Sequence, residues 1–287
     1  MGMKILISAD IEGVTGITGG SFLNTSSQEY QDARLLMTEE INVVANCCFN
    51  NGVEEVYLVD AHGSGKNVLP ELLNSKINFV NKHKRRTSML EGIEQVDYCI
   101  FLGYHGKANQ HYSYCAHTNS TKLISGVFIN NVEFGESGLN VLVAKDNGVK
   151  LIFLSGTNNA VEEIKQLIPN LPTVTTKVSL SQHQSQLKDK DVVFNEIKES
   201  LASTLKNVDT INRADFKAQI FHWKVLVPYA YLLEDVDSHI DLHLDSVKHN
   251  NSNPREVTFS SSNIAEGYKK YQQLLSLFSK NYNKINN

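Results

Sequence analysis

The stretch KILISADIE, residues 4–12, decides the fold. KILIS is a short apolar run, which is the pattern of a β-strand buried in a sheet. Asp10 and Glu12 follow directly, where this strand reaches the edge of the sheet. In an extended segment both carboxylates point the same way, and they repel each other unless a proton or a cation lies between them. The stretch therefore predicts a buried strand that ends in a candidate metal site.

Strands and helices alternate along the chain beyond this first strand. Apolar runs predict strands over residues 56–59, 77–80, 98–102, 149–154 and 173–178, and an extended segment over residues 124–130. Helical spacing predicts a long helix from an N-cap at Ser27 to about Asn50, and helices over residues 67–73, 136–147 and 158–167. This alternation favours an α/β fold with a mainly parallel sheet flanked by helices on both faces.

The pattern loosens after Ser179. The polar stretch 179–191 is interpreted as a connection, followed by a helix over 192–205, strands over 219–227 and 258–260, and a closing helix over 264–280. We therefore predict two domains: a metal-binding catalytic α/β domain over residues 1–179 and a smaller α+β domain over residues 180–287. The basic run KHKRR, residues 82–86, is interpreted as a solvated loop.

Composition excludes several functions. With 287 residues, of which 41% are hydrophobic and 20% charged, the chain has the composition of a soluble globular protein. A net charge of −4 gives no electrostatic basis for nucleic-acid binding. The N-terminus holds too short an apolar run for a signal peptide, and no stretch approaches the roughly 18 apolar residues of a membrane span. Four cysteines without a CxxC spacing are expected to be reduced thiols. We expect a cytoplasmic protein that binds neither nucleic acid nor a membrane.

Polar residues follow other strands as Asp10 follows the first. His62 comes just after the strand at 56–59, and His105 just after the strand at 98–102. The carboxyl ends of parallel strands meet at one edge of a sheet, so these residues can lie close together despite their separation in sequence. Carboxylates and imidazoles are zinc ligands, and five of them are enough to hold two ions. The candidate ligands are Asp10, Glu12, His62, His105 and Glu136.

Each of these residues also has a plainer explanation. Asp10 can be a turn former, His105 a polar surface residue, and Glu136 a partner for the positive end of a helix dipole. His117, in the stretch YCAHTNS, is either a loop histidine without a task or a catalytic group over the metals. His111 in the same loop is treated as a bystander. Taken alone, the residues leave a shared metal site and unrelated structural roles both open.

Seven motifs in a fixed order narrow this choice. They are SADIEGVTGI, ARLLMTEEIN, VDAHGS, MLEGI, FLGYHGKA, CAHT and GESGLN, spread over about residues 4–154. With them the chain resembles the zinc-dependent D-aminopeptidases of the DppA type, peptidase family M55. Two departures concern substrate preference more than catalysis. Ala116-His117-Thr118 stands where the family often has Ser-His-Ser, and the loop from His105 to His117 is about one residue longer.

The resemblance implies two zinc ions per subunit, held by the five candidate ligands. It implies that Asp10 bridges both ions. Glu12 and His105 would complete the ligands of one ion, and His62 and Glu136 those of the other.

The resemblance also implies the roles of residues around the ligands. His117 is expected to be the catalytic residue, as acid/base, oxyanion stabiliser or nucleophile. Asp60 is a candidate to orient an imidazole ligand from behind. Glu39 and Glu40 are expected to serve helix packing or hydrogen bonding rather than metal contact.

The implied function is a dinuclear zinc aminopeptidase that hydrolyses short peptides with an N-terminal D-residue such as D-Ala. Two alternatives stay open. One is a metallopeptidase or amidohydrolase for L-residue or cell-wall-derived peptides, and the other is a non-catalytic metal-containing peptide-binding protein.

Members of this family assemble into decameric rings whose active sites face an inner chamber, so the resemblance implies a homo-oligomer. The apolar strip of the closing helix and the stretch FHWKVLV, residues 221–227, fit either oligomer contacts or core packing.

Overall fold

The computed structural model describes residues 2–80, 88–236, 248–250 and 252–286. Its larger sheet has seven strands in the order β3-β2-β1-β4-β7-β8-β9, and every neighbouring pair is parallel except β8 and β9. The strand order changes direction between β1 and β4, which makes this a topological switch point. The strands are β1 Met3–Ala9, β2 Val53–Asp60, β3 Ile77–Phe79, β4 Tyr98–Tyr104, β7 Lys150–Thr157, β8 Thr173–Ser181 and β9 Gln184–Leu187.

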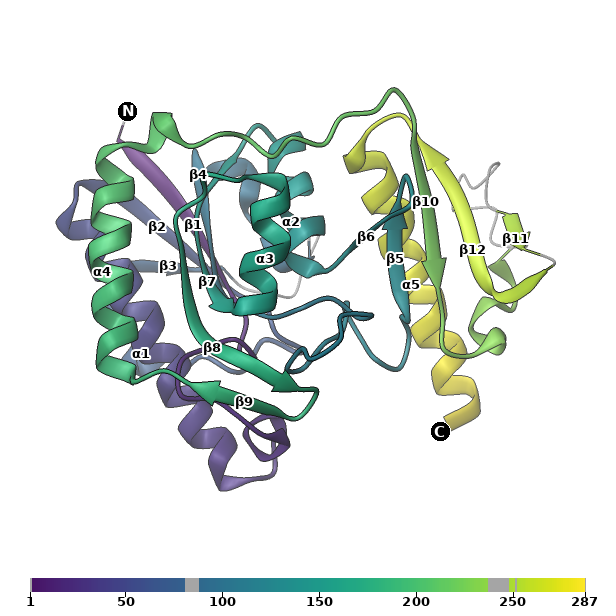
Figure 1. Ribbon diagram of the computed structural model, residues 1–287, viewed down its shortest axis with the longest axis horizontal. Coiled ribbons are helices and arrows are strands. Elements are labelled where there is room, and N and C mark those ends of the chain that lie inside the picture. Colours follow the sequence, from purple (N-terminus) through teal and green to yellow (C-terminus); the bar gives the residue numbers. More distant parts are fainter. Residues whose placement is uncertain (1, 81–87, 237–247, 251, 287) are drawn as a thin grey trace.

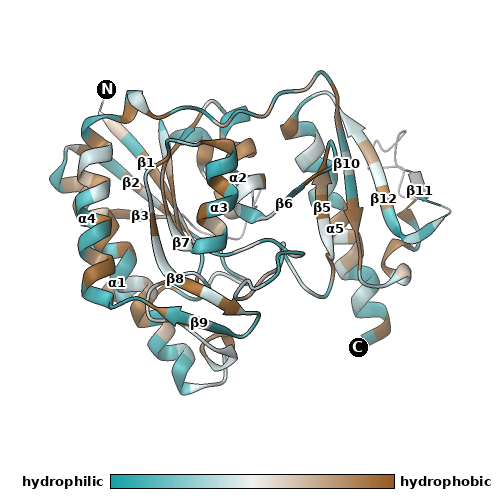
Figure 2. Ribbon diagram, viewed as in Figure 1, coloured by the Kyte–Doolittle hydropathy of each residue, from teal (hydrophilic) through white to brown (hydrophobic). Residues whose placement is uncertain are grey.

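Helices cover both faces of this sheet (Figure 1). On one face, α1 (Gln28–Asn50) packs with α4 (Lys190–Lys206); on the other, α2 (Glu136–Asp146) packs with α3 (Asn158–Leu167). The first helix begins where the sequence predicts, because the Ser27 hydroxyl accepts a hydrogen bond from the Tyr30 N–H at 3.1 Å. Apolar residues concentrate on the central strands between the two helix layers (Figure 2). The predicted mainly parallel α/β fold is confirmed.

A second, smaller sheet is antiparallel, with the order β11-β12-β10-β5-β6. Helix α5 (Ile264–Asn286) packs on β10 and β12 and also contacts α2 (Figure 1). This sheet and helix form a smaller α+β unit. The strands are β5 Gly126–Ile129, β6 Val132–Phe134, β10 Phe221–Leu226, β11 Lys248–Asn250 and β12 Asn253–Ser261.

The apolar strip of α5 is used inside the subunit. Tyr268, Tyr271 and Phe278 are buried. The Trp223 ring on β10 lies 5.5 Å from Phe259 and 6.3 Å from Tyr271, measured between centroids. Core packing therefore explains the apolar residues of both stretches, and these buried side chains are not available as contacts between copies.

Three strands, β6, β9 and β11, were not expected from the sequence. The stretch 179–191 is not a simple connection, because β8 continues to Ser181 and turns into β9. Its polar composition follows from its position, since β9 is an edge strand with mostly exposed side chains. Strand β6 pairs with β5 through a two-residue turn at Asn130 and Asn131, whose φ angles are 50° and 65°. Two left-handed residues are what a tight type I′ hairpin turn requires, and asparagine tolerates them.

The predicted helix over residues 67–73 is shorter than expected. Only the single 3₁₀ turn Pro70–Leu72 forms, with Pro70 at its start. A proline fits the first turn of a helix, and the preceding residue Leu69 is extended as a residue before proline should be. Other 3₁₀ turns among the described residues are Gly20–Leu23, Ser88–Leu90, Ile93–Gln95, Val208–Thr210 and Ala230–Leu233.

Strand pairing divides the chain differently from the predicted boundary near residue 180. Strand β9 and helix α4 lie beyond that point but belong to the larger sheet and its helix layer. Strands β5 and β6 precede it but pair within the smaller sheet. The division into two domains at residues 1–179 and 180–287 stays a proposal, and the two sheets exchange segments across it.

Within the described ranges, no helix has the length and apolarity needed to cross a membrane. All four cysteines are free, and Cys47, Cys48 and Cys99 are buried as expected of small apolar side chains. The basic run at residues 82–86, which we interpret as a solvated loop, lies outside the described residues.

Candidate metal centre

The candidate ligands meet at the carboxyl edge of the larger sheet, around its switch point. Asp10 and His105 directly follow the ends of β1 and β4, and His62 lies two residues beyond the end of β2. Glu136 is the first residue of α2, which packs against β4 and β7. In open parallel sheets, bound molecules and ions lie in a crevice at the switch point, because the chain leaves the sheet in opposite directions on its two sides.

Gly103 allows β1 and β4 to approach closely at this edge. Its φ angle is +70°, and a Cβ atom there would lie 2.1 Å from the carbonyl oxygen of Asp10. The close approach is held by hydrogen bonds from Asp10 N to the Leu102 carbonyl (2.8 Å) and from Gly13 N to the Gly103 carbonyl (2.7 Å). Only glycine fits such a position. The resulting irregularity in β4 places His105 beside Asp10.

Asp10 lies at the centre of the cluster. One carboxylate oxygen is 3.3 Å from His62 Nδ1, and the other is 3.4 Å from His105 Nε2. Glu12 Oε2 also approaches His62 Nδ1, at 2.8 Å. Glu136 Oε2 is 3.5 Å from His105 Nε2. The single Asp10 side chain thus joins a His62 side and a His105 side.

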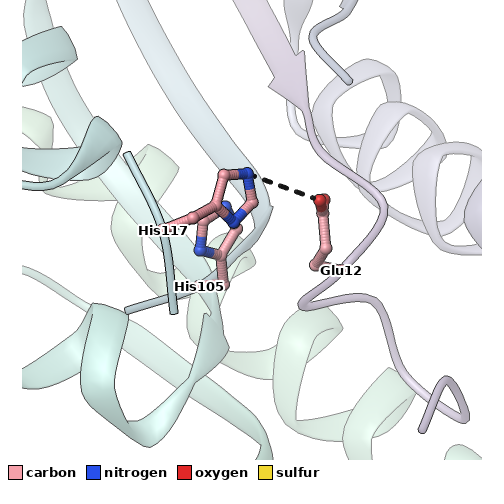
Figure 3. Close-up of side chains that lie close together, drawn as sticks. All are labelled: Glu12, His105 and His117. Atoms are coloured by element: carbon pink, nitrogen blue, oxygen red, sulfur yellow. Dashed lines mark ion pairs between the residues drawn. The ribbon is translucent and has the colours of Figure 1, made fainter. Parts of the chain in front are cut away.

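His117 lies over the same carboxylates. Its ring stacks on that of His105, with centroids 4.2 Å apart and planes 9° apart. Its Nε2 is 3.8 Å from Glu12 Oε1 and 3.6 Å from Glu136 Oε1, and Figure 3 shows the imidazole facing Glu12. Its Nδ1 is 2.8 Å from the carbonyl oxygen of Cys115. A carbonyl only accepts, so Nδ1 carries the proton and Nε2 is left for chemistry at the site.

The donor set fits metal ions. Asp10 Oδ2, Glu12 Oε2 and His105 Nε2 are buried, and their closest polar contacts are with one another and with His62. Two buried carboxylates and an imidazole nitrogen that converge in this way form a donor set suited to a cation. His105 Nδ1 lies 3.0 Å from the Gly106 carbonyl, which directs Nε2 into the cluster as in many metal-ligating histidines.

Ligand atoms within 4.8 Å of one another form three overlapping groups in the described part of the chain. They are Asp10–Glu12–His62, Asp10–His105–Glu136 and Glu12–His105–His117. All five expected ligands and His117 are therefore brought together. One group joins Glu12 to His62, another joins Glu136 to His105, and the third keeps Glu12 with His105, so the assignment of ligands to ions stays a prediction.

The pKa values of Asp10, His62 and His105 show the effect of the buried carboxylates on the cluster. Burial favours a protonated Asp10, but hydrogen bonds with His105 and His62 outweigh it and hold the pKa of this carboxyl well below its usual range. Burial opposes charge on the imidazoles, yet Glu12 raises the pKa of His62 and Glu136 that of His105, both well above the ordinary histidine value. The buried carboxylates therefore favour positive charge at this site, which bound cations can provide.

The loop that carries Glu12 is fixed from β8. Lys177 Nζ donates to the carbonyl oxygens of Glu12 (2.8 Å) and Ile17 (2.6 Å), and Thr176 Oγ1 donates to that of Gly13 (2.6 Å). Lys177 is fully buried, and burial lowers its pKa to about 7. A lysine within a predicted buried strand was the available signal for this support, and sequence reasoning missed it.

Glu40 fixes the same loop from α1, as expected of a residue without metal contact. Its carboxylate accepts from the Thr15 N–H at 2.8 Å and the Ser155 hydroxyl at 3.0 Å. Burial raises its pKa, although both hydrogen bonds oppose the shift. The neighbouring Glu39 instead forms an exposed ion pair with Lys190.

The buried Glu40 and the exposed Glu39 give a matched pair of variants. Glu40→Ala leaves the Thr15 N–H and Ser155 hydroxyl without their partner and should lower the free energy of unfolding by roughly 2–3 kcal/mol. Glu39→Ala should leave it almost unchanged, because exposed ion pairs contribute little. Urea unfolding of the two variants measures both effects, and equal losses would show that Glu40 does not hold the loop.

Asp60 supports His62 through the backbone. Its carboxylate accepts from the N–H of Asn67 (2.7 Å), the Asn67 side-chain amide (2.8 Å) and the N–H of Val68 (3.2 Å). The Asn67 amide also donates to the His62 carbonyl at 2.9 Å. Asp60 therefore closes the turn that carries His62.

Comparison with known proteins identifies the family. The family model for D-aminopeptidase peptidases matches residues 3–239. The chain belongs to the D-aminopeptidase family. A D-aminopeptidase of Bacillus subtilis (strain 168) is 30% identical over 213 residues, which cover 73% of this chain and 76% of that protein. The predicted enzyme class, a metallo-aminopeptidase, is thereby confirmed.

The fold of this D-aminopeptidase family member also matches a solved structure. The zinc-dependent D-aminopeptidase DppA from Bacillus subtilis, a self-compartmentalizing protease, aligns over 96% of this chain and 98% of its own, with a TM-score of 0.87 and 24% identity. That match extends the shared fold to α5, which lies beyond the residues matched by the family model.

Proposed function

We propose that the protein is an aminopeptidase that uses two zinc ions to remove an N-terminal D-residue, such as D-Ala, from short peptides. The single observation that carries the proposal is the central place of Asp10. Its two carboxylate oxygens face two separate ligand groups, which share only this residue. The family match supports the peptidase reaction, and the zinc dependence of the DppA relative supports the metal.

In this proposal Glu12 and His62 would hold one ion together with Asp10, and His105 and Glu136 would hold the other. These are carboxylate and imidazole donors, which zinc prefers. When bound, two zinc ions supply an activated water and polarise the scissile carbonyl.

His117 is the proposed catalytic residue. The Cys115 carbonyl keeps the proton on Nδ1, so Nε2 faces the reacting centre with its lone pair. From there it can accept the proton released on attack and return it to the leaving amine. Attack by Nε2 itself on the carbonyl carbon is the second use that this geometry permits.

We further propose a cytoplasmic homo-oligomer, in the form of a decameric ring. The DppA relative is a self-compartmentalizing protease, which supports assembly. Exposed apolar residues lie together in sequence at the edge hairpin and the start of α4, where a second copy could cover them. They are Val178, Leu180, Leu187 and Val192.

A pair of dipeptides that differ only in chirality tests the reaction. D-Ala-Gly should be cleaved much faster than L-Ala-Gly, and a chelator should abolish cleavage until zinc is restored. Faster cleavage of L-Ala-Gly would point to the alternative peptidase for L-residues. No turnover of any peptide by the zinc-loaded protein would instead favour a binding protein.

A further inference from the structure

A cavity of about 500 Å³ lies beside the metal centre, and two distant segments build its wall. Asp10, His117 and Glu136 line it on the metal side. Leu275 and Ser279 of α5 line it from the smaller unit. Helix α5 lies outside the residues matched by the family model, so the cavity is completed by a part of the chain that carries none of the motifs.

Asn119 connects these two parts of the wall. Its backbone N–H donates to Glu136 Oε1 at 2.7 Å, which places it beside a proposed ligand. Its side-chain oxygen accepts a hydrogen bond from the hydroxyl of Tyr271 on α5. The residue has a φ angle of +61°, a left-handed conformation that asparagine tolerates better than most residues. Asn119 also lines the cavity.

Tyr271 determines which end of the Asn119 amide is free. The phenol is fully buried, and burial, with Tyr268 and Glu136 nearby, raises its pKa well above the usual value. It therefore keeps its proton and must donate it, since a buried hydroxyl without an acceptor is unfavourable. The amide oxygen of Asn119 takes that proton, and the structure gives the amide NH₂ no acceptor among the described residues. Asn119 thus offers the cavity a donor only.

We propose that Asn119 is a substrate-binding residue whose side-chain NH₂ donates to the scissile carbonyl oxygen, and that Tyr271 is a positioning residue that fixes this amide. The inference rests on the proposed peptidase function. A donor-only group matches a carbonyl oxygen, on which negative charge develops during attack, and not the substrate's ammonium group. The hydrogen bond to Glu136 places Asn119 next to the reacting centre rather than at the far end of the peptide.

Two variants and their combination test this pair. Asn119→Gly removes the donor, keeps the backbone bond to Glu136, and suits the positive φ angle. It should lower kcat about 100-fold with little change in KM, as loss of one oxyanion donor does. Tyr271→Phe keeps the buried ring and should lower kcat about 10-fold. In the double variant the loss should equal that of Asn119→Gly alone, because the phenol acts only through the amide.

The controls separate this role from a structural one. Tyr282→Phe removes a hydroxyl from the same helix and should leave kcat unchanged. Zinc content, measured by elemental analysis, should match wild type in every variant. Loss of zinc from Asn119→Gly would overturn the proposal, because the residue would then act through Glu136.

The substrates locate the contact. D-alaninamide contains only the scissile carbonyl, whereas D-Ala-Gly-Gly adds downstream ones, and Asn119→Gly should lose the same factor on both. A loss confined to the tripeptide, wild-type kcat in Asn119→Gly, or a double variant that shows the product of the single losses would each contradict the proposal. Failure of wild-type protein to cleave either substrate would instead refute the peptidase function on which it rests.

Discussion

Asp10→Asn is expected to release both metal ions and to lower kcat/KM for D-Ala-Gly by roughly 10⁴-fold or more. Asp10 is the only side chain common to the His62 group and the Glu136 group. Its replacement by an amide would remove the charge that the two proposed ions share and leave one oxygen where two are needed. Elemental analysis of the purified variant measures the loss of zinc, and the dipeptide assay measures the loss of activity.

Asp32→Asn is the matched control for this substitution. Asp32 is exposed on α1, so the same chemical change there should keep both zinc content and activity. An Asp10→Asn variant that still held two zinc ions per chain would show that the carboxylate does not bridge them. One retained ion would show that Asp10 belongs to a single ligand group.

His117→Ala is expected to retain zinc, unlike Asp10→Asn, while kcat falls about 10²–10⁴-fold. The five proposed ligands all remain in this variant. The side chain lost is the one whose Nε2 faces Glu12 and Glu136 across the site. Its effect should therefore fall on the chemical step and not on metal binding.

His111→Ala, an exposed residue of the same loop, is the control and should behave as wild type. Retained turnover in His117→Ala would exclude an essential catalytic role for this histidine. Loss of zinc in that variant would assign it to the ligands instead, as the group Glu12–His105–His117 permits.

Much of the fold could be predicted because its signals are local. The N-cap at Ser27 and the periodicity up to Asn50 define α1, and buried apolar runs define β1, β2, β4 and β7. Strands β6, β9 and β11 were missed because they are short strands at sheet edges, and the side chains of β6 and β9 alternate weakly or are exposed. Their pairing depends on turns and neighbouring strands, which a local apolar pattern does not record.

The identity of the candidate ligands could be predicted from the sequence, but their contacts could not. Residues at strand ends could be chosen as candidate ligands, because the carboxyl ends of parallel strands meet at one edge. The contacts of His105 and Glu136 within the cluster could not be predicted, since they depend on how β4 bends at Gly103 and where α2 begins. Lys177 and Tyr271 lie far from every motif in sequence and reach the site only through the packing of β8 and α5.

Zinc titration of metal-free protein, followed by cleavage of D-Ala-Gly, tests the central claim most directly. Two ligand groups that share Asp10 predict that binding saturates at two zinc ions per chain and that full activity is reached only at that point. Saturation and full activity at one ion per chain, or activity without zinc, would contradict a dinuclear zinc centre.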